Sequence, residues 1–289
     1  MKQTSAIQTT YLSILSSAGL AVLKGTVGVL GNSYAMIADA IESTTDIFAS
    51  IIVLIGLKVS SKPADKDHPY GHGKAEAVAT FAVAAIMIIS ATLICSKSIE
   101  NINTPHDLPK SFTLYVLGAI ILFKEASFQY VNRKSKEANS TALKADAWHH
   151  RSDAITSLAA FIGISIALVM GNGYETADDW AALLASCAIF YNSYLILKPA
   201  MGEIMDEHHY DEMIQQIRLL SKEVKGLIDT EKCLVRKAGM EYYVDLHIKV
   251  NAAISVKEGH DIAHRLKDHL LKALPEIVDV LIHVEPVED

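Results

Sequence analysis

The chain has 289 residues, 51% of them hydrophobic, and a mean hydropathy of +0.25. This composition is high for a soluble enzyme and ordinary for a chain divided between lipid and water. The formal net charge is -7, without the excess of basic residues that is typical of nucleic-acid-binding proteins, so we expect no nucleic-acid partner. Three cysteines without paired spacing predict no disulfide framework.

Apolar runs fill the first two thirds of the sequence, and each is close to the roughly 20 residues that cross a lipid bilayer. Six such runs lie at residues 10–30, 34–57, 78–96, 112–130, 154–170 and 180–197. After about residue 205, histidines and charged residues replace the apolar ones. The sequence therefore predicts a six-helix transmembrane domain over residues 1–204 and a separate C-terminal domain over residues 205–289.

Basic residues are concentrated in the loops that follow the second and fourth apolar runs. The opposite loops carry few, namely Lys97 and Lys110. By the positive-inside rule, both termini and the C-terminal domain are predicted to be cytoplasmic. An even number of spans agrees with this orientation.

One of two similar segments lies in the second run, and the other lies directly before the fifth. One reads ADAIESTTD, residues 38–46, and the other reads ADAWHHRSD, residues 145–153. If the fifth helix begins at Ser140 as its N-cap, His149 and Asp153 lie nine and thirteen residues beyond it, about 14 to 20 Å along the axis. The repeated segments are therefore predicted to lie deep in the membrane, where inverted-repeat transporters place their binding sites.

Each segment ends with a pair of side chains that could bind a metal ion. Glu42 and Asp46 share one helix face, and so do His149 and Asp153, because residues four apart are neighbours on a helix. Three carboxylates and one imidazole suit a divalent first-row cation, with zinc the first choice. Asp39 and Asp146, one turn earlier, are predicted as ligands, as supports of the ligands, as part of a proton path or as structural groups.

The buried charges also allow other interpretations. Ion pairs with Lys24, Lys124 or Arg151 would make the charges structural, although ionisable residues inside membranes are by default functional. An intramembrane metal-dependent hydrolase would need an open metal position and a general base, and no HExxH pattern occurs. A monovalent cation/proton antiporter would use carboxylates alone, and a metal sensor would not need a site deep in the membrane.

A second candidate metal site lies in the loop after the second run. The segment PADKDHPYGHGKAE places Asp65, His68 and His72 three and four residues apart. A short loop can wrap such ligands around one ion, although exposed loop histidines without a metal are also common.

The C-terminal segment predicts a helix, two strands, a helix and a strand. Apolar and polar residues alternate over 242–250 and 278–285, which is typical of half-buried strands. Ser255 and Glu258 form a predicted capping box at the start of the second helix. We therefore predict a small α+β domain of ferredoxin-like type.

The ExxxD and HxxxD pairs, the six apolar runs, the loop DKDHPYGHGKAE and the histidine-bearing tail together resemble the cation diffusion facilitator family of metal/proton antiporters. The resemblance covers nearly the whole chain. It departs at Glu42, where family members commonly have Asp or His. It implies a transport site at Glu42, Asp46, His149 and Asp153, and a cytoplasmic-side site at the three loop residues.

The resemblance also implies a homodimer with a metallochaperone-like regulatory and dimerisation domain. Tail positions that match family metal ligands are His247, His260, His283 and Glu285, with Glu231 where bacterial members often have His. A Lys74–Asp206 interlock between the membrane domains of the dimer is implied as well.

We accordingly expect a secondary transporter, not an enzyme, in the lipid bilayer of a bacterial inner or plasma membrane. Its expected substrate is cytoplasmic Zn²⁺ or a similar ion (Fe²⁺, Mn²⁺, Co²⁺ or Cd²⁺), exported in exchange for protons. Metal binds neutral imidazole and ionised carboxylates, so protons and metal compete for the same groups. Histidine, with an unperturbed pKa of about 6.5, makes His149 the natural proton-coupled ligand.

Overall fold

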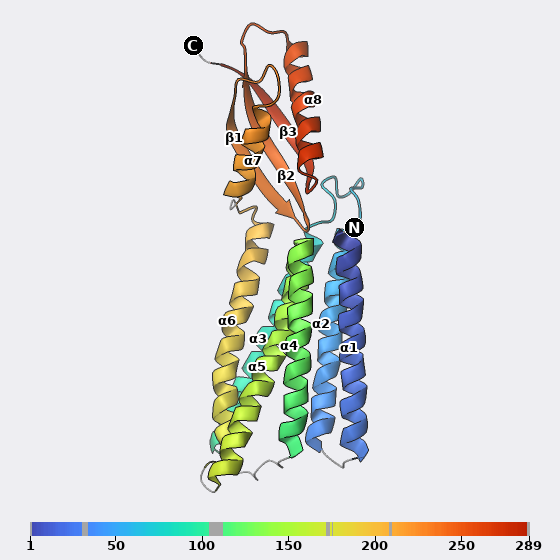
Figure 1. Cartoon of the computed structure of the whole chain (residues 1–289), viewed down its shortest axis with the longest axis vertical. Coiled ribbons are helices and arrows are strands. Elements are labelled where there is room, and N and C mark those ends of the chain that lie inside the picture. Colours follow the sequence, from blue (N-terminus) through green and yellow to red (C-terminus); the bar gives the residue numbers. More distant parts are fainter. Residues whose placement is uncertain are drawn as a thin grey trace. The chain divides into compact units, whose positions relative to one another are not determined.

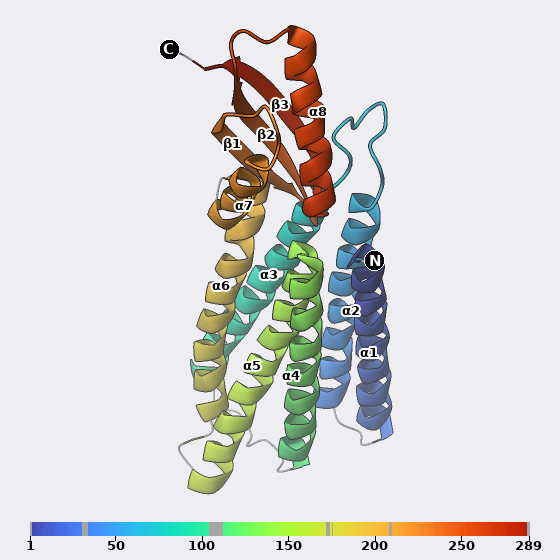
Figure 2. The same cartoon turned by 45° about the horizontal axis from the view of Figure 1, so that its top comes forward.

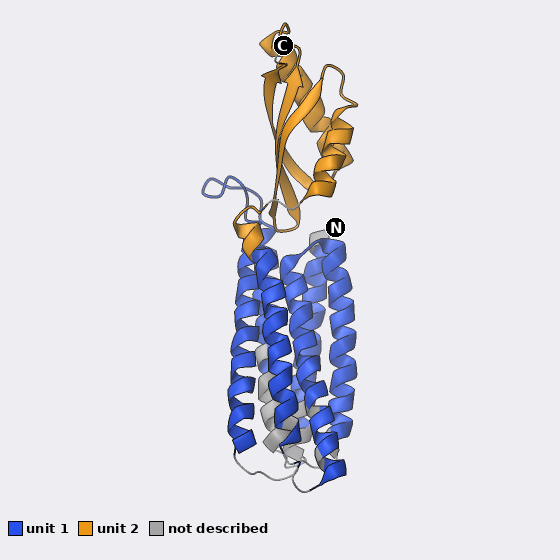
Figure 3. Cartoon of the chain, turned by 90° about the vertical axis from the view of Figure 1, so that its left-hand side faces the viewer, with its two compact units in different colours: residues 1–200 blue, residues 201–289 orange. Residues whose placement is uncertain are grey.

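The computed structural model describes residues 2–30, 34–103, 112–171, 174, 176–207 and 210–287. Within these ranges, the side chains at positions 2, 3, 24, 27–30, 34–42, 45, 112, 113, 160, 167 and 178 lie outside the description. The chain divides into two compact units, Met1–Ala200 and Met201–Asp289, coloured blue and orange in Figure 3.

Long helices side by side form the first unit (Figures 1 and 2). The six helices are α1 Lys2–Leu30, α2 Tyr34–Ser60, α3 Ala75–Asn103, α4 Phe112–Ala138, α5 Thr141–Met170 and α6 Ala177–Ile204, whose last turn belongs to the second unit. Within the described residues, five of them contain a stretch long and apolar enough to cross a membrane. The sixth, α2, has side chains described only from Ser43 onward.

The helix α5 brings the charged segment into the bundle because it starts earlier than its apolar run. Asn139, with φ of 59°, ends the preceding turn, and the Ser140 hydroxyl accepts a hydrogen bond from the Leu143 amide at 3.0 Å. The Ser140 hydroxyl and the Ala142 amide in turn donate to the buried Glu76 carboxylate of α3. The predicted N-cap is confirmed, and α5 continues unbroken from Thr141 to Met170.

The helices α2 and α3 approach closely at a glycine. A Cβ atom added at Gly56 would overlap the Cβ of Ala79, and it would also lie 3.4 Å from the Ala75 carbonyl. Ala79 is 5% exposed and is therefore enclosed by its neighbours. This contact fixes the distance between the two helices that flank the loop at residues 61–74.

The second unit is a three-stranded sheet with helices on one face (Figure 3). Its elements are α7 Asp211–Ser221, β1 Asp229–Ala238, β2 Glu241–Val250, α8 Val256–Ala273 and β3 Ile277–Pro286. The central strand β2 pairs antiparallel with β1 and parallel with β3. The predicted element order, α+β class and capping box of Ser255 and Glu258 are confirmed.

The core of this unit lies between the sheet and its helices. Val244, Leu246 and Ile248 of β2 face Leu266 and Leu270 of α8, and all five are at most 1% exposed. The alternate side chains of β2, including His247, therefore lie on the opposite face of the sheet.

We expect Gly56→Ala to lower the melting temperature of the detergent-solubilised protein, because overpacking of a tight contact costs about 1–3 kcal/mol. The matched control is Gly19→Ala, since a Cβ at Gly19 meets nothing within 4 Å. Intrinsic fluorescence during heating measures both variants. Equal melting temperatures for the two would contradict the close approach of α2 and α3.

Candidate functional site

Three of the predicted ligand side chains converge inside the helix bundle. Asp46 of α2 and His149 and Asp153 of α5 each offer one ligand atom, and these atoms lie within 4.8 Å of one another. The His149 Nε2 lies 3.2 Å from Asp46 Oδ1. Asp46 and His149 are 6% and 4% exposed, whereas Asp153 is partly open.

A lysine completes this cluster. The Nζ atom of Lys124, from α4, donates to Asp46 Oδ2 at 2.6 Å and to Asp153 Oδ2 at 2.8 Å. Lys124 is 2% exposed. One of the structural ion pairs considered from the sequence is therefore present, and it involves the same carboxylates that are predicted to bind metal.

The other two basic residues considered as partners differ from Lys124. The guanidinium of Arg151 lies 4.4 Å from the ring centre of Phe128 and 5.7 Å from that of Trp148, which is a cation–π arrangement. The side chain of Lys24 lies outside the described residues.

Two predicted residues on α2 cannot be placed. The side chains of Glu42 and Asp39 lie outside the described residues, although both positions belong to α2. Glu42 precedes Asp46 by one helical turn, so its predicted role as the fourth ligand stays a prediction.

A cavity of about 360 Å³ borders the cluster. Asp46, His149 and Asp153 line it together with hydroxyl groups of Ser152 and Thr156 and with apolar residues of α3. The three ligand groups are thus accessible from the α3 side, while Lys124 reaches the carboxylates from α4.

A second buried polar network lies on α5 next to the cluster. Ser50 of α2 donates to Asp146 Oδ1 at 2.7 Å, and Ser13 of α1 lies 2.7 Å from His150 Nε2. The two serine hydroxyls are 3.3 Å apart, and all four residues are at most 4% exposed. Asp146 therefore joins α5 to α2, and His150 joins α5 to α1. This fits the structural role among those predicted for Asp146.

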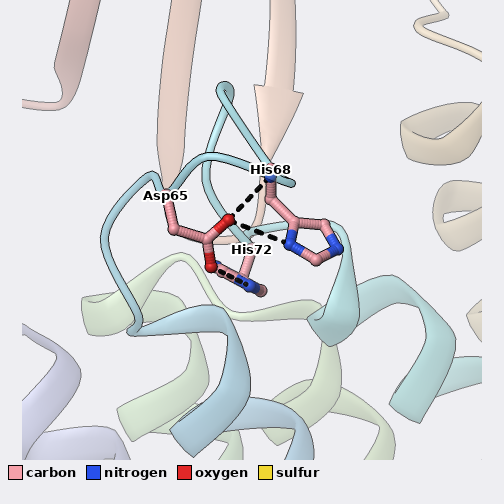
Figure 4. A group of neighbouring side chains, drawn as sticks. All are labelled: Asp65, His68 and His72. Carbon is pink, nitrogen blue, oxygen red and sulfur yellow. Dashed lines mark hydrogen bonds and ion pairs between the residues drawn. The ribbon is translucent and has the colours of Figure 1, made fainter.

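The loop residues also come together, as Figure 4 shows. One carboxylate oxygen of Asp65 accepts from the backbone of His68 at 2.7 Å and lies 3.2 Å from its Nδ1, while the other lies 3.4 Å from His72 Nε2. These hydrogen bonds, chiefly that from the His68 backbone, hold the pKa of Asp65 below its usual value. Gly71, at φ of 75°, permits the turn that returns His72 to Asp65.

In the C-terminal unit, three of the four predicted ligands cluster on the open sheet face. His247 Nδ1 lies 2.6 Å from Glu285 Oε1, and His283 Nε2 lies 3.6 Å from the same oxygen. The hydrogen bond with His247 lowers the pKa of Glu285. The ring of His260 instead meets the ring of His264 on α8 edge to face, with 4.3 Å between the ring centres. His260 also lines a cavity of about 390 Å³ together with Glu285.

The predicted dimer interlock involves two residues in different units. Lys74 precedes α3 in the first unit, and Asp206 follows α6 in the second at φ of 54°. Their pairing between protomers stays a prediction.

Two contributions were not predicted from the sequence as part of the site. Lys124 was considered only as a structural partner, and the signal that it offers is a single cation inside the apolar run 112–130. His150 was not among the predicted site residues, and it is 1% exposed and hydrogen-bonded to Ser13 of α1. Its hydrogen-bond partner is a serine of another helix, and a single serine in an apolar run does not indicate in the sequence which residue it contacts.

Comparison with known proteins agrees with this architecture. Residues 10–205 match the cation efflux transmembrane domain, and residues 210–287 match the cytoplasmic domain of cation efflux proteins. The manganese efflux system protein MneP of Bacillus subtilis is 31% identical over 276 residues, which cover 93% of each chain.

More distant relatives are similar over most of this chain. Metal tolerance protein C1 of Arabidopsis thaliana is 28% identical over 291 residues, covering 95% of this chain and 61% of the plant protein. The magnetosome protein MamB of Magnetospirillum gryphiswaldense is 25% identical over 268 residues, covering 92% of this chain and 89% of that protein.

The fold and these matches define an integral membrane transporter of divalent metal cations, not an enzyme. The chain belongs to the cation diffusion facilitator family, with its transmembrane domain followed by its cytoplasmic domain. The family resemblance and the fold class predicted from the sequence are confirmed.

We expect Ser50→Ala to lower the melting temperature of the protein in detergent, because it removes a hydrogen-bond donor to the fully buried Asp146. Leaving a buried acceptor without its partner costs about 1–3 kcal/mol. Ser127→Ala is the matched control, since the Ser127 hydroxyl bonds only its own helix on an exposed face. An unchanged melting temperature for Ser50→Ala would show that the network does not hold α5.

Proposed function

We propose that this protein exports a divalent first-row metal cation from the cytoplasm in exchange for protons, through a site made by Asp46, His149 and Asp153 with Glu42. The observation that carries the proposal is the convergence of three ligand groups within 4.8 Å in the bundle of a cation transporter. Residues 1–204 form the transport domain in this proposal, and residues 205–289 the cytoplasmic regulatory and dimerisation domain.

Proton coupling follows from the chemistry of the ligands. A metal ion binds the ionised carboxylates of Asp46 and Asp153 and the neutral imidazole of His149, so each protonation of these groups opposes metal binding. A lower pH on the far side of the membrane therefore favours release of the metal, and return of the protonated site carries protons inward. Alternating access supplies the movement between the two sides.

The donor set limits the metal to a few candidates. Imidazole suits zinc and iron, whereas carboxylate oxygens suit manganese. Zinc is the cation expected first from the sequence. Manganese, one of the similar ions, is favoured as a second candidate because the relative MneP is named a manganese efflux system protein. We propose that both can bind and that the flux assay below ranks them.

In this proposal, the protein acts as a homodimer in a bacterial membrane, with both termini in the cytoplasm. Support for the dimer is the match of residues 210–287 to the cytoplasmic domain of cation efflux proteins. Support for the orientation is the basic character of the loop at residues 61–74 and of the α4–α5 junction at residues 132–144, which lie at the same end of the bundle as the N-terminus (Figure 1).

The alternative within transporters is monovalent cation/proton antiport. A monovalent ion gains little from an imidazole ligand, so His149 favours the divalent ion. The flux experiment distinguishes the two directly.

We expect proteoliposomes with a pH-sensitive dye inside to show metal-driven proton flux for wild type with Zn²⁺ or Mn²⁺ and not with Na⁺. Asp153→Asn should abolish this flux, because it removes a negative charge and an anionic ligand without changing side-chain size. Fe²⁺ and Co²⁺ complete the ranking of metals.

The matched control for this assay is Glu125→Gln, which neutralises a carboxylate outside the site, on α4, where it accepts a hydrogen bond from Gln129 of the same helix. It should retain flux. If Asp153→Asn transports as wild type does, or if Na⁺ alone drives proton flux, the proposed site or the proposed substrate is wrong.

The loop residues are proposed to bind metal on the cytoplasmic side before transport. His72→Asn should raise the KM for metal several-fold and leave the number of protons exchanged per metal unchanged, because the coupling groups lie in the bundle. The same proteoliposomes measure both quantities, with Lys66→Gln in the same loop as control. Loss of coupling in His72→Asn would contradict this division of roles.

A further inference from the structure

Lys124 occupies the position that a bound cation would take between two carboxylates. Its Nζ lies 2.6 Å from Asp46 Oδ2 and 2.8 Å from Asp153 Oδ2, so one ammonium joins α2, α4 and α5. The second oxygen of Asp46 faces His149 at 3.2 Å. The ammonium and the imidazole thus share the same ligand carboxylate.

Burial makes this contact strong. Lys124 is 2% exposed, and the exposed fraction of the Asp46 side chain is 8%. An ammonium has three N–H donors and no acceptor, so carboxylates are its natural partners where water is scarce. The lysine neutralises one of the two negative charges of Asp46 and Asp153. These three side chains together keep a net charge of -1, without Glu42 and His149.

A dication and the ammonium cannot use these oxygens together. Transition metals bind carboxylate oxygens at about 2.0–2.2 Å, which would leave the lysine nitrogen within a few ångströms of a doubly charged ion. Like charges repel strongly at that distance in a buried site. A metal entering from the cavity on the α3 side must therefore displace the ammonium from at least one carboxylate.

We propose that Lys124 is a tethered competing cation that sets the affinity and the charge selectivity of the transport site. This inference rests on the proposed function of that site. A monovalent ion that displaces the ammonium only replaces one positive charge with another. A dication adds one more positive charge beside the carboxylates, so only the dication is attracted more strongly than the ammonium it displaces. The returning ammonium also helps to expel the metal, and it keeps the carboxylates compensated after release.

The test compares neutral and charged replacements in the purified full-length protein. Lys124→Gln and Lys124→Met remove the charge, and Lys124→Arg retains it. Calorimetry measures the Kd for Zn²⁺ and Mn²⁺, with and without excess Na⁺. The proteoliposome assay gives the KM and the maximal rate of metal flux.

We expect both neutral variants to bind the dications at least about tenfold more tightly than wild type, since removing one repelling charge near a dication has an effect of that order even in a polar medium. Their KM should fall and their maximal rate should also fall, because release slows. Excess Na⁺ should weaken metal binding to the neutral variants and not to wild type. Lys124→Arg should bind metal no more tightly than wild type.

Neutral variants that bind metal as weakly as wild type, or more weakly, overturn the inference while leaving the transport site intact. Neutral variants that fold only when Zn²⁺ or Mn²⁺ is added support it, because the metal then replaces the missing charge. Neutral variants that fail to fold even with metal overturn it in favour of a purely structural lysine. A wild-type protein that binds neither dication overturns this inference and the proposed function together.

Discussion

The arrangement of the helices depends above all on the free-energy cost of burying charged side chains among apolar helices. Removing one partner of a buried ion pair costs about 3–5 kcal/mol, since the remaining charge is left without compensation. Asp46 and Asp153 meet this constraint by sharing the ammonium of Lys124. The same two carboxylates are the proposed metal ligands. In the proposed mechanism, the stability of the metal-free protein and the binding of the metal therefore depend on the same carboxylates, and the metal replaces an interaction that also holds the bundle together.

The position of α5 makes this arrangement possible. Its N-terminus is fixed by Ser140, whose hydroxyl caps the helix and bonds Glu76 of α3. Asp146, one turn before His149, bonds Ser50 of α2, and His150, next to His149 in the sequence, bonds Ser13 of α1. These contacts orient the helix about its own axis, so that His149 and Asp153 face Asp46 and the cavity. The proposed transport site is thus supported by a neighbouring network of polar side chains on α1, α2 and α5.

Features encoded locally could be predicted from the sequence. The Ser140 cap, the Ser255–Glu258 capping box and the alternation in β2 each depend on residues a few positions apart. The meeting of Asp46 with His149 and Asp153 was predicted from the repeated segment, because equal spacing in two helices places the pairs at equal depth. Features that depend on how two helices rotate against each other could not be predicted. The reach of Lys124 from α4 to both carboxylates is one example, and the placement of His150 against Ser13 is another.

The most direct test of the central claim is anomalous diffraction from crystals of the full-length protein grown with Mn²⁺ or Zn²⁺. The account predicts an anomalous peak within coordination distance of Asp46, His149 and Asp153, with the Lys124 ammonium moved away from at least one carboxylate. The peak should disappear in Asp46→Asn. Peaks confined to the loop at Asp65 or to the sheet face at His247, with none in the bundle, would contradict the account.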